Sequence, residues 1–436
     1  MADDTLFAEF LDHANRPDPI QFLRGCARRR SRASATAVAS SAPTQRSAPC
    51  CSIRASAPTT CRPPAGNPFK DLILNPISNR VSTAHRPLIF RDPPDHDRLR
   101  GLVMRESSIS RVLGLRERVA GEVDGLIDAC RGRSEICLVG DLSYPRPVSV
   151  ICTLLGVPGA DEPWFLGWAT QLSTALEPDA RYDGNPPQVR RCPRRNLGLP
   201  AWTDPREAAP PGRRHAQRAR RARAGRPETD ERVRPDRDGG PAAGCGHETT
   251  VNLITNNMLT LLRHPEELER LRADPEPAPR VIEEMLRFEA PVHFRTRNAL
   301  GAIEVGGRTI PKGAPVVLLL AAACRDPSRF AKPDRFDPDR KDTQHLGFGG
   351  GLHYCIGAPL ARIEAEIALV ALSRRLVAPR LLKDPPPYRP GAALRGPEQL
   401  AIGIPPTWPD PPVPAPPDRA ERNSRPEPRT SASGRG

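Results

Sequence analysis

The stretch Phe348-Gly-Gly-Gly351-Leu-His353-Tyr-Cys355-Ile-Gly357 decides how this 436-residue chain is interpreted. It places a cysteine in a glycine-rich loop that runs into a predicted helix beginning APLARIEAE. Backbone N–H groups and the positive end of the helix dipole are expected to lower the thiol pKa of Cys355 from about 8.5. Glycines also let the backbone approach a flat ligand closely. A thiolate held in this way suits a soft metal or the iron of haem.

Prolines and the spacing of apolar residues divide much of the remaining chain into expected helices and one expected hairpin. Apolar residues recur at helical spacing in residues 110–130 and 248–264. Two shorter helices, bounded by prolines, are expected in residues 265–275 and 279–291. Residues 302–323 (AIEVGGRTIPKGAPVVLLLAAA) predict two apolar strands joined by a Gly-Gly turn.

Four residues around Cys355 make its loop resemble the haem-binding loop of the cytochrome P-450 superfamily. They are Phe348, Gly351, His353 and Gly357, each at the offset from the cysteine that the family uses. A cysteine without such neighbours would be expected to be an ordinary buried thiol. The resemblance implies haem b (iron protoporphyrin IX) as the cofactor and Cys355 as the ligand of its iron. Phe348, His353 and Gly357 would then contact the cofactor.

The resemblance also implies the fold. Members of the superfamily are mainly α-helical with small β-sheets and form a single large domain. Residues 1–404 would form this domain, although residues 25–66 and 181–244 do not match it. Residues 405–436 are rich in proline, arginine and serine and are expected to be a disordered tail.

A second motif, Glu284-Met-Leu-Arg287, resembles the helical Glu-x-x-Arg of the same superfamily. Residues three apart on a helix share a face, so an ordinary surface ion pair is the alternative. The family joins this pair to an arginine in a later, proline-punctuated loop, and Arg335 in KPDRFDPDR is the matching residue. The resemblance implies that the three residues hold the fold around the cysteine loop and take no part in catalysis.

A third motif, Gly246-His-Glu-Thr-Thr250, resembles the oxygen-activation turn of the family's long central helix. The resemblance implies two catalytic residues. Thr249 would hold the proton network of bound dioxygen, and Glu248 would help to deliver protons for O–O cleavage. An acid beside an alcohol on a helix carries little information alone, since a threonine in mid-helix usually serves only packing. The family usually has alanine where this chain has Cys245.

Cationic residues are expected to hold the two propionates of the haem. His96 and Arg100, in DPPDHDRLR, lie four residues apart and therefore on one face of a short helix. Arg297 and His353 match two further propionate contacts of the family. Cations suit the propionates because both partners of such a hydrogen bond are charged. Without the resemblance each of these residues would be taken for an ordinary surface charge.

The reaction that the resemblance implies is monooxygenation. One oxygen atom of O2 enters an apolar small molecule and the other leaves as water, while a thiolate ligand favours O–O cleavage. Electrons would come from a ferredoxin and its NAD(P)H-dependent reductase. An inactive copy or a peroxide-using relative stays open as an alternative, although Glu248 and Thr249 favour dioxygen.

The formal net charge of +14 raises an alternative from another class, a basic nucleic-acid-binding protein. Two segments carry this charge. Residues 25–66 contain seven Arg and no Lys, Asp or Glu, and residues 181–240 contain sixteen Arg against eight acidic residues. The rest of the chain is close to neutral, and it has no RNP, zinc-finger or helix-turn-helix pattern. We therefore expect no nucleic-acid partner.

The same two regions, residues 25–66 and 181–244, are anomalous in composition. The only large aliphatic residues of the stretch 181–240 are Val189, Leu197, Leu199 and Val233. Such a stretch cannot bury enough apolar surface to offset the entropy cost of ordering. Disordered basic linkers are one interpretation, and coding DNA read out of frame is the one that we favour. Codons chosen for residues 241–246 read Leu-Leu-Leu-Ala-Ala-Gly after a one-base shift, which is the apolar run that a central helix needs before His247.

Targeting signals and disulfides are not expected. No apolar run approaches the ~18 residues of a membrane helix, and the acidic start MADDTLFAEF is unlike a signal peptide. The odd count of 11 cysteines argues against a disulfide framework. A zinc site among Cys26, Cys50, Cys51 and Cys61 is a minor alternative, since no histidine stands near them. The sequence therefore predicts a cytoplasmic protein with no membrane partner.

Overall fold

The computed structural model describes residues 88–144 except Ser107, residues 149, 150, 152 and 240–405, and the strand 53–54. The prediction of a zinc site among Cys26, Cys50, Cys51 and Cys61 falls outside these residues. So do the predictions for residues 181–239 and 406–436, and for residues 25–66 apart from the strand.

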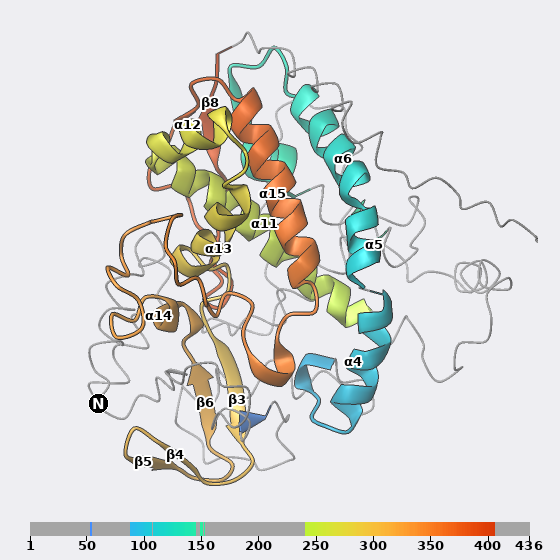
Figure 1. Ribbon diagram of the computed structural model, residues 1–436, viewed down its shortest axis with the longest axis vertical. Coiled ribbons are helices and arrows are strands. Elements are labelled where there is room, and N and C mark those ends of the chain that lie inside the picture. The colour runs from blue at the N-terminus through green and yellow to red at the C-terminus, as the bar shows by residue number, and fades with distance from the viewer. Residues whose placement is uncertain are drawn as a thin grey trace, which may run out of the picture.

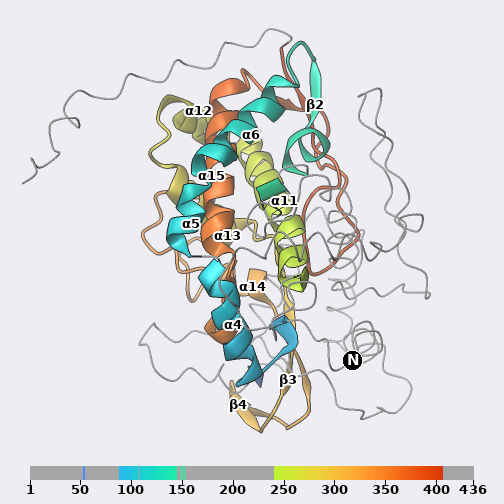
Figure 2. The ribbon, with the colours of Figure 1, turned by 90° about the vertical axis from the view of Figure 1, so that its right-hand side faces the viewer.

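Three long helices form the body of the described structure. They are α6 (Arg116–Asp128), α11 (Gly240–Arg263) and α15 (Ala358–Arg375). Helix α15 lies between the other two and packs against both (Figures 1 and 2). Helices α12 (Pro265–Ala273) and α13 (Ala278–Phe288) pack against α11 and α15 and complete the main core.

The remaining described helical segments are α4 (Asp95–Glu106), which has 12 residues, and several shorter ones. The shorter ones are η4 (Leu88–Phe90), α5 (Ile109–Gly114), the π-helical turn η5 (Val139–Ser143), α14 (Leu320–Cys324) and the 3-10 turn η7 (Gly351–His353). Within the described parts of the chain, no helix is both long enough and apolar enough to cross a membrane.

Small antiparallel sheets lie at two ends of the helical body (Figure 1). One sheet has the order β1-β3-β6, and a second has the order β2-β8-β7. Strands β4 and β5 form a separate hairpin. The bounds are β1 (Ile53–Arg54), β2 (Glu135–Cys137), β3 (Arg295–Ala299), β4 (Ile303–Val305), β5 (Arg308–Ile310), β6 (Pro315–Leu318), β7 (Arg380–Leu381) and β8 (Ala401–Gly403). The mainly helical fold with small sheets is as predicted.

The predicted helix boundaries are confirmed where they are set by proline. Helix α11 ends at Arg263 and α12 begins at Pro265. Proline fits this first helical position because its missing N–H would have no partner there. Residues 110–130 form most of α5 and all of α6, whose buried side chains Val119, Val123 and Ile127 repeat at helical spacing.

The predicted Gly-Gly hairpin is confirmed, but only part of the apolar run after it forms the predicted strand. Gly306 and Gly307 have φ of 56° and 74°, which a tight turn between β4 and β5 requires. The predicted second long strand is wrong beyond Leu318. There β6 ends, and residues 320–324 turn into the short helix α14. The described part of the run from Val316 to Cys324 is buried or half-buried, whether strand or helix, so its hydrophobicity could not distinguish the two.

A turn near the end of the described chain docks on one face of α11. Asn252 meets this turn at Gly396, where a Cβ would lie only 2.5 Å from the side-chain carbonyl carbon of Asn252. One helical turn later, the Asn256 amide donates to the Arg395 carbonyl at 3.1 Å. Glycine at position 396 therefore lets the turn approach the helix closely.

Candidate active site

The cysteine loop is closed by a backbone hydrogen bond. The N–H of Cys355 donates to the carbonyl of Phe348 at 3.0 Å. Gly349 and Gly351, with φ of 72° and 64°, allow the reversal between these two residues. Phe348 packs against the main hydrophobic core, which anchors one side of the loop. Gly357 is the N-cap residue of α15.

The sulfur of Cys355 lies at the start of α15 and receives two backbone N–H groups, from Gly357 and Ala358. These bonds, together with Arg100 and Arg295, lower its pKa, as the sequence suggested. The predicted net direction is nevertheless wrong. Protein atoms crowd the sulfur, and this desolvation raises the thiol pKa above its ordinary value, although the residue keeps an exposed surface. A thiolate here therefore calls for a bound cation such as a metal ion.

The structure brings together the four cationic or imidazole residues predicted to hold the propionates. Helix α4 carries His96 and Arg100, and the rings of His96 and His353 meet edge to face at 4.7 Å between centroids. Arg100 also donates to the Tyr354 carbonyl at 2.9 Å, next to the cysteine. Burial, assisted by the nearby Arg297, lowers the pKa of His353 to about 4.

These residues fit haem by the chemistry of their donors. His96 is 1% exposed, and among the described residues its Nε2 has no hydrogen-bond partner. Arg297 and Arg100, two arginines, lie near enough to His353 to act on its charge. A ligand with two carboxylates would give this group its missing partners. The thiol of Cys355 beside it supplies a soft ligand for iron.

The predicted oxygen-activation turn is helical and lies within α11. Thr249 donates from Oγ1 to the Gly246 carbonyl at 3.2 Å, and Thr250 donates to the same carbonyl at 2.9 Å. Glu248 forms an ion pair with Arg389, a residue of the turn that docks on α11. Sequence reasoning missed Arg389, because an arginine in a proline-rich loop gives no sign of which helix it will meet.

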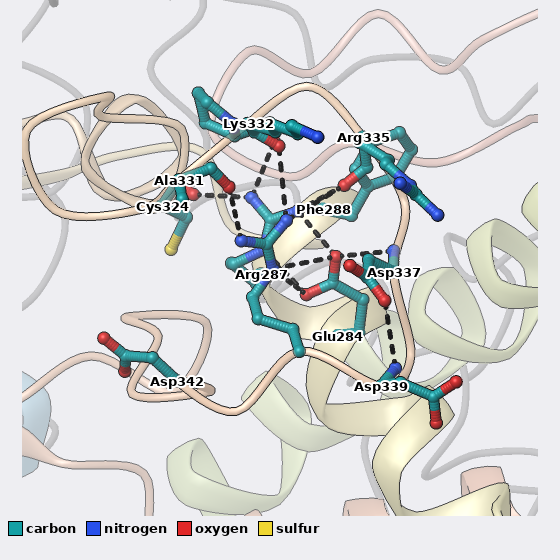
Figure 3. A network of polar contacts seen from close by, with 12 residues as sticks. Glu284, Arg287, Phe288, Cys324, Ala331, Lys332, Arg335, Asp337, Asp339 and Asp342 are labelled. Carbon is teal, nitrogen blue, oxygen red and sulfur yellow. Dashed lines mark hydrogen bonds and ion pairs between the residues drawn. The ribbon is translucent and has the colours of Figure 1, made fainter.

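The Glu-x-x-Arg pair is fully buried and extensively hydrogen-bonded (Figure 3). Both Arg287–Glu284 hydrogen bonds measure 2.7 Å. The Glu284 carboxylate also accepts the backbone N–H of Asp337 at 2.9 Å. Arg287 donates in addition to main-chain carbonyls of the proline-punctuated loop. The pair therefore holds that loop against α13.

The third member of this cluster is Arg340, which corrects the prediction of Arg335. The Arg340 guanidinium lies 3.2 Å from the Glu284 carboxylate and is 8% exposed. Arg335 contributes its main-chain carbonyl, which accepts from Arg287, and its exposed side chain points away from Glu284 (Figure 3). The loop contains Pro-Asp-Arg twice, and spacing alone does not tell which arginine turns inward.

His247, next to Glu248, is completely buried, and its ring stands edge to face against Tyr144 at 4.8 Å. Neither ring nitrogen has a hydrogen-bond partner among the described residues. Burial, assisted by Arg389, lowers its pKa to about 3. The imidazole is therefore neutral in the folded protein at neutral pH.

The buried His247 should make the protein sensitive to acid. Below the ordinary histidine pKa of 6.5 the unfolded chain binds a proton that the folded chain does not. Stability is then lost as pH falls from about 6.5 to about 3, by up to about 1.4 kcal/mol per pH unit. Urea titrations of His247→Phe should show a free energy of unfolding that declines less steeply over this range than that of the wild type. Equal slopes would contradict a buried, neutral His247.

Comparisons with known proteins agree with this geometry. The sequence profile of the family described as Cytochrome P450 matches residues 278–397, which include the buried Glu-x-x-Arg pair and the cysteine loop. The chain is 37% identical to Cytochrome P450 107B1 of Saccharopolyspora erythraea, over 72% of this chain and 76% of that protein. It is also 37% identical to Cytochrome P450 monooxygenase PikC of Streptomyces venezuelae, over 75% of this chain and 78% of that protein. Among solved structures, ligand-free CYP164A2 of Mycobacterium smegmatis superposes with a TM-score of 0.72 and 32% identity, covering 92% of this chain and 100% of that one.

Proposed function

The chain belongs to the cytochrome P450 family, and on that premise we propose that it holds haem b through Cys355 and hydroxylates an apolar small molecule. Members of the family bind haem and act as monooxygenases, so the protein is an oxidoreductase. The observation that carries the specific proposal is the meeting of His96, Arg100 and His353 beside a cysteine whose sulfur accepts two backbone N–H groups.

Each residue of the cysteine site has a definite task in this proposal. Haem, when bound, supplies the activation of dioxygen. The N–H groups of Gly357 and Ala358 hold the sulfur of Cys355 and spread its negative charge. His96 Nε2 and the Arg100 guanidinium would bind the carboxylates of the cofactor and so fix its orientation.

Glu248 and Thr249 are the residues proposed to handle protons: Glu248 would help to deliver them, and Thr249 would hold the proton network. The hydrogen bond from Thr249 Oγ1 to the Gly246 carbonyl orients the hydroxyl, whose oxygen can accept a hydrogen bond from a water molecule or a neighbouring acid. The ion pair with Arg389 holds the Glu248 carboxylate in place on α11. With haem bound, Glu248 would help to deliver protons for O–O cleavage.

Electrons and substrate complete the proposal. We propose that a ferredoxin, reduced by an NAD(P)H-dependent reductase, supplies the two electrons of each turnover. The proposed substrate is an apolar small molecule, into which one oxygen atom is inserted with the chemistry that the cofactor supplies. O2 is the second substrate, with peroxide as the alternative oxidant.

The test is the absorption spectrum of the purified full-length chain, expressed with the reading frame of residues 25–66 and 181–244 restored, loaded with haem, reduced and exposed to carbon monoxide. A thiolate-type Soret shift is expected. A parallel reaction with O2, ferredoxin, reductase and NAD(P)H should consume NAD(P)H, whereas peroxide alone should not replace these components. Haem that binds without the thiolate-type shift, or no haem binding at all, would overturn the proposal.

Replacing Thr249 with alanine should separate oxygen consumption from product formation. The thiolate-type spectrum should persist, but product formation should fall on the order of a hundredfold, because a side chain positioned for proton transfer contributes that much or more. NAD(P)H and O2 should still be consumed. Thr250→Ala is the matched control, since Thr250 donates to the same Gly246 carbonyl but has no assigned proton role. Equal coupling in the two variants would remove Thr249 from the mechanism.

We propose further that residues 1–404 form one domain, and that the DNA encoding residues 25–66 and 181–244 is read out of frame. The proposal rests on composition, because these two regions hold most of the chain's excess arginine. Resequencing the DNA tests it. An unbroken, confirmed frame with unrelated codons across residues 181–244 would contradict it, and a restored frame should yield an apolar run before His247.

A further inference from the structure

We infer that Glu283, through His345 and Arg362, positions both ends of the cysteine loop and so sets how firmly the Cys355 sulfur is held. The inference rests on the proposed function, which gives the sulfur its role. Glu283 stands on α13 directly before the buried Glu284, but its carboxylate serves a different set of partners.

The first partner, His345, lies at the start of the loop and is 4% exposed. Its Nε2 lies 3.1 Å from a carboxylate oxygen of Glu283. Its Nδ1 accepts the backbone N–H of Gly347 at 3.0 Å. Because Nδ1 is an acceptor, the ring proton is on Nε2 and is donated to the carboxylate. The ring therefore links α13 directly to the loop backbone.

The contact leaves the loop little freedom at this point. A Cβ at Gly347 would lie 2.7 Å from the Leu286 carbonyl of α13, so only glycine permits such a close approach. The neighbouring N–H of Leu346 donates to the buried sulfur of Cys324 at 3.2 Å. The start of the loop is thus held against α13 and α14 by hydrogen bonds at two consecutive backbone N–H groups.

The second partner, Arg362, acts at the other end of the loop. This residue of α15 donates to Glu283 from Nε at 2.5 Å and from Nη2 at 2.9 Å, a two-point pairing. Its remaining Nη1 donates to the Tyr354 hydroxyl at 3.3 Å. The guanidinium also lies over the ring of Phe348, 4.6 Å from the centroid. The closing hydrogen bond of the loop runs from Cys355 to Phe348. Arg362 therefore contacts the acceptor residue, Phe348, and the residue just before the donor, Tyr354.

One carboxylate thus holds the loop from two directions. Arg362 and His345 together lower the pKa of Glu283 to about 2 despite its partial burial, so the carboxylate is ionised at neutral pH. None of these three residues touches the Cys355 sulfur in any described contact. Their role is positioning, because the loop they hold presents the sulfur to its N–H donors. The Glu283–Arg362 pair lines a surface cavity of about 220 Å³, so water can replace lost contacts and variants are expected to fold.

The test measures backbone hydrogen exchange in the full-length chain, with and without haem. The informative amide is that of Cys355, which donates to Phe348, and the reference amide is that of Leu138, which donates to Leu400 far from the loop. In Glu283→Gln the Cys355 amide should exchange about tenfold faster or more, because a charged hydrogen-bond partner is lost. The Leu138 amide should not change. Glu276→Gln is the matched control, since it removes an exposed carboxylate near the start of the same helix.

Two substitutions of His345 separate its two contacts. Asparagine can still accept the Gly347 N–H, as in an Asx turn, but cannot reach Glu283. Glutamine can still donate to Glu283 but offers Gly347 no acceptor in the right place. If both halves of the link matter, each variant should speed exchange of the Cys355 amide. In the haem-loaded protein, each variant should also convert faster from the thiolate-type to a non-thiolate spectrum once it is reduced and exposed to carbon monoxide.

Hydrogen exchange of the Cys355 amide can be measured in the haem-free protein. The positioning role of Glu283 and the proposed function can therefore be contradicted separately. A Cys355 amide that exchanges at the wild-type rate in both Glu283→Gln and His345→Asn would overturn the inference, whatever the haem spectrum shows. An accelerated Cys355 amide with no thiolate-type spectrum in the wild type would support the positioning role and overturn only the function of the sulfur.

Discussion

Replacing Cys355 with alanine is expected to abolish the thiolate-type Soret shift of the reduced, carbon monoxide-bound protein and to reduce turnover to background. The sulfur is the proposed iron ligand, and a methyl group cannot replace either its charge or its bond to the metal. Cys355→His should give a second diagnostic result. An imidazole can bind iron, so haem should be retained without the thiolate-type spectrum and without O–O cleavage.

The control for this prediction is another cysteine outside the loop. Cys137 is a partly buried cysteine on β2, and Cys137→Ser should leave the spectrum and turnover unchanged. Both variants should be compared at equal haem content, so that loss of the cofactor is not mistaken for loss of the ligand. An unchanged spectrum in Cys355→Ala would mean that another group binds the iron.

Replacing Arg287 with methionine is expected to lower the free energy of unfolding by about 3–5 kcal/mol, because breaking one partner of a buried ion pair leaves an uncompensated charge. Arg287 and Glu284 are both 0% exposed at their side chains. The substitution also removes donors from the carbonyls of Cys324, Pro333 and Arg335. Urea titration monitored by circular dichroism measures the loss.

Substitutions of two further arginines provide a comparison for the loss of stability expected in Arg287→Met. Arg340→Gln should cost about 1–3 kcal/mol, since it removes a partner of the buried Glu284 but leaves Arg287 in place. Arg335→Gln should cost about 0.5 kcal/mol or less, because that side chain is exposed and only its main-chain carbonyl is used. If Arg335→Gln lowered the free energy of unfolding more than Arg340→Gln, Arg335 would be the third member of the cluster, as the sequence predicted.

The limits of the sequence at the site are clear from individual residues. Short-range spacing predicted that His96 and Arg100 share a helix, and motif offsets placed His353 beside them. The pKa direction of Cys355 was missed because it depends on how many protein atoms surround the sulfur, which no local pattern reveals. Arg389 was missed for a similar reason, since its ion pair with Glu248 joins residues far apart in the chain.

The fold shows the same division between local and distant information. Pro265 and the two glycines at positions 306 and 307 fixed boundaries through their own backbone geometry. Strand β3 (RTRNA) was not predicted, because its residues are polar and it is a strand only through pairing with β6. Helix α14 continues the apolar run of β6, and its conformation is decided by neighbours and not by composition.

The pairing of β2 with β8 has a consequence for how the polypeptide is made in the cell. Strand β8 is the middle strand of its sheet, yet the ribosome delivers Ala401–Gly403 long after Glu135–Cys137. Until then the backbone N–H and C=O groups of β2 that will bond to β8 are unpaired and can pair with another nascent chain. Strands so far apart in the sequence also pair slowly. A stop codon before Leu400 would release a polypeptide with an intact cysteine loop, and its expected fate is inclusion bodies or proteolysis.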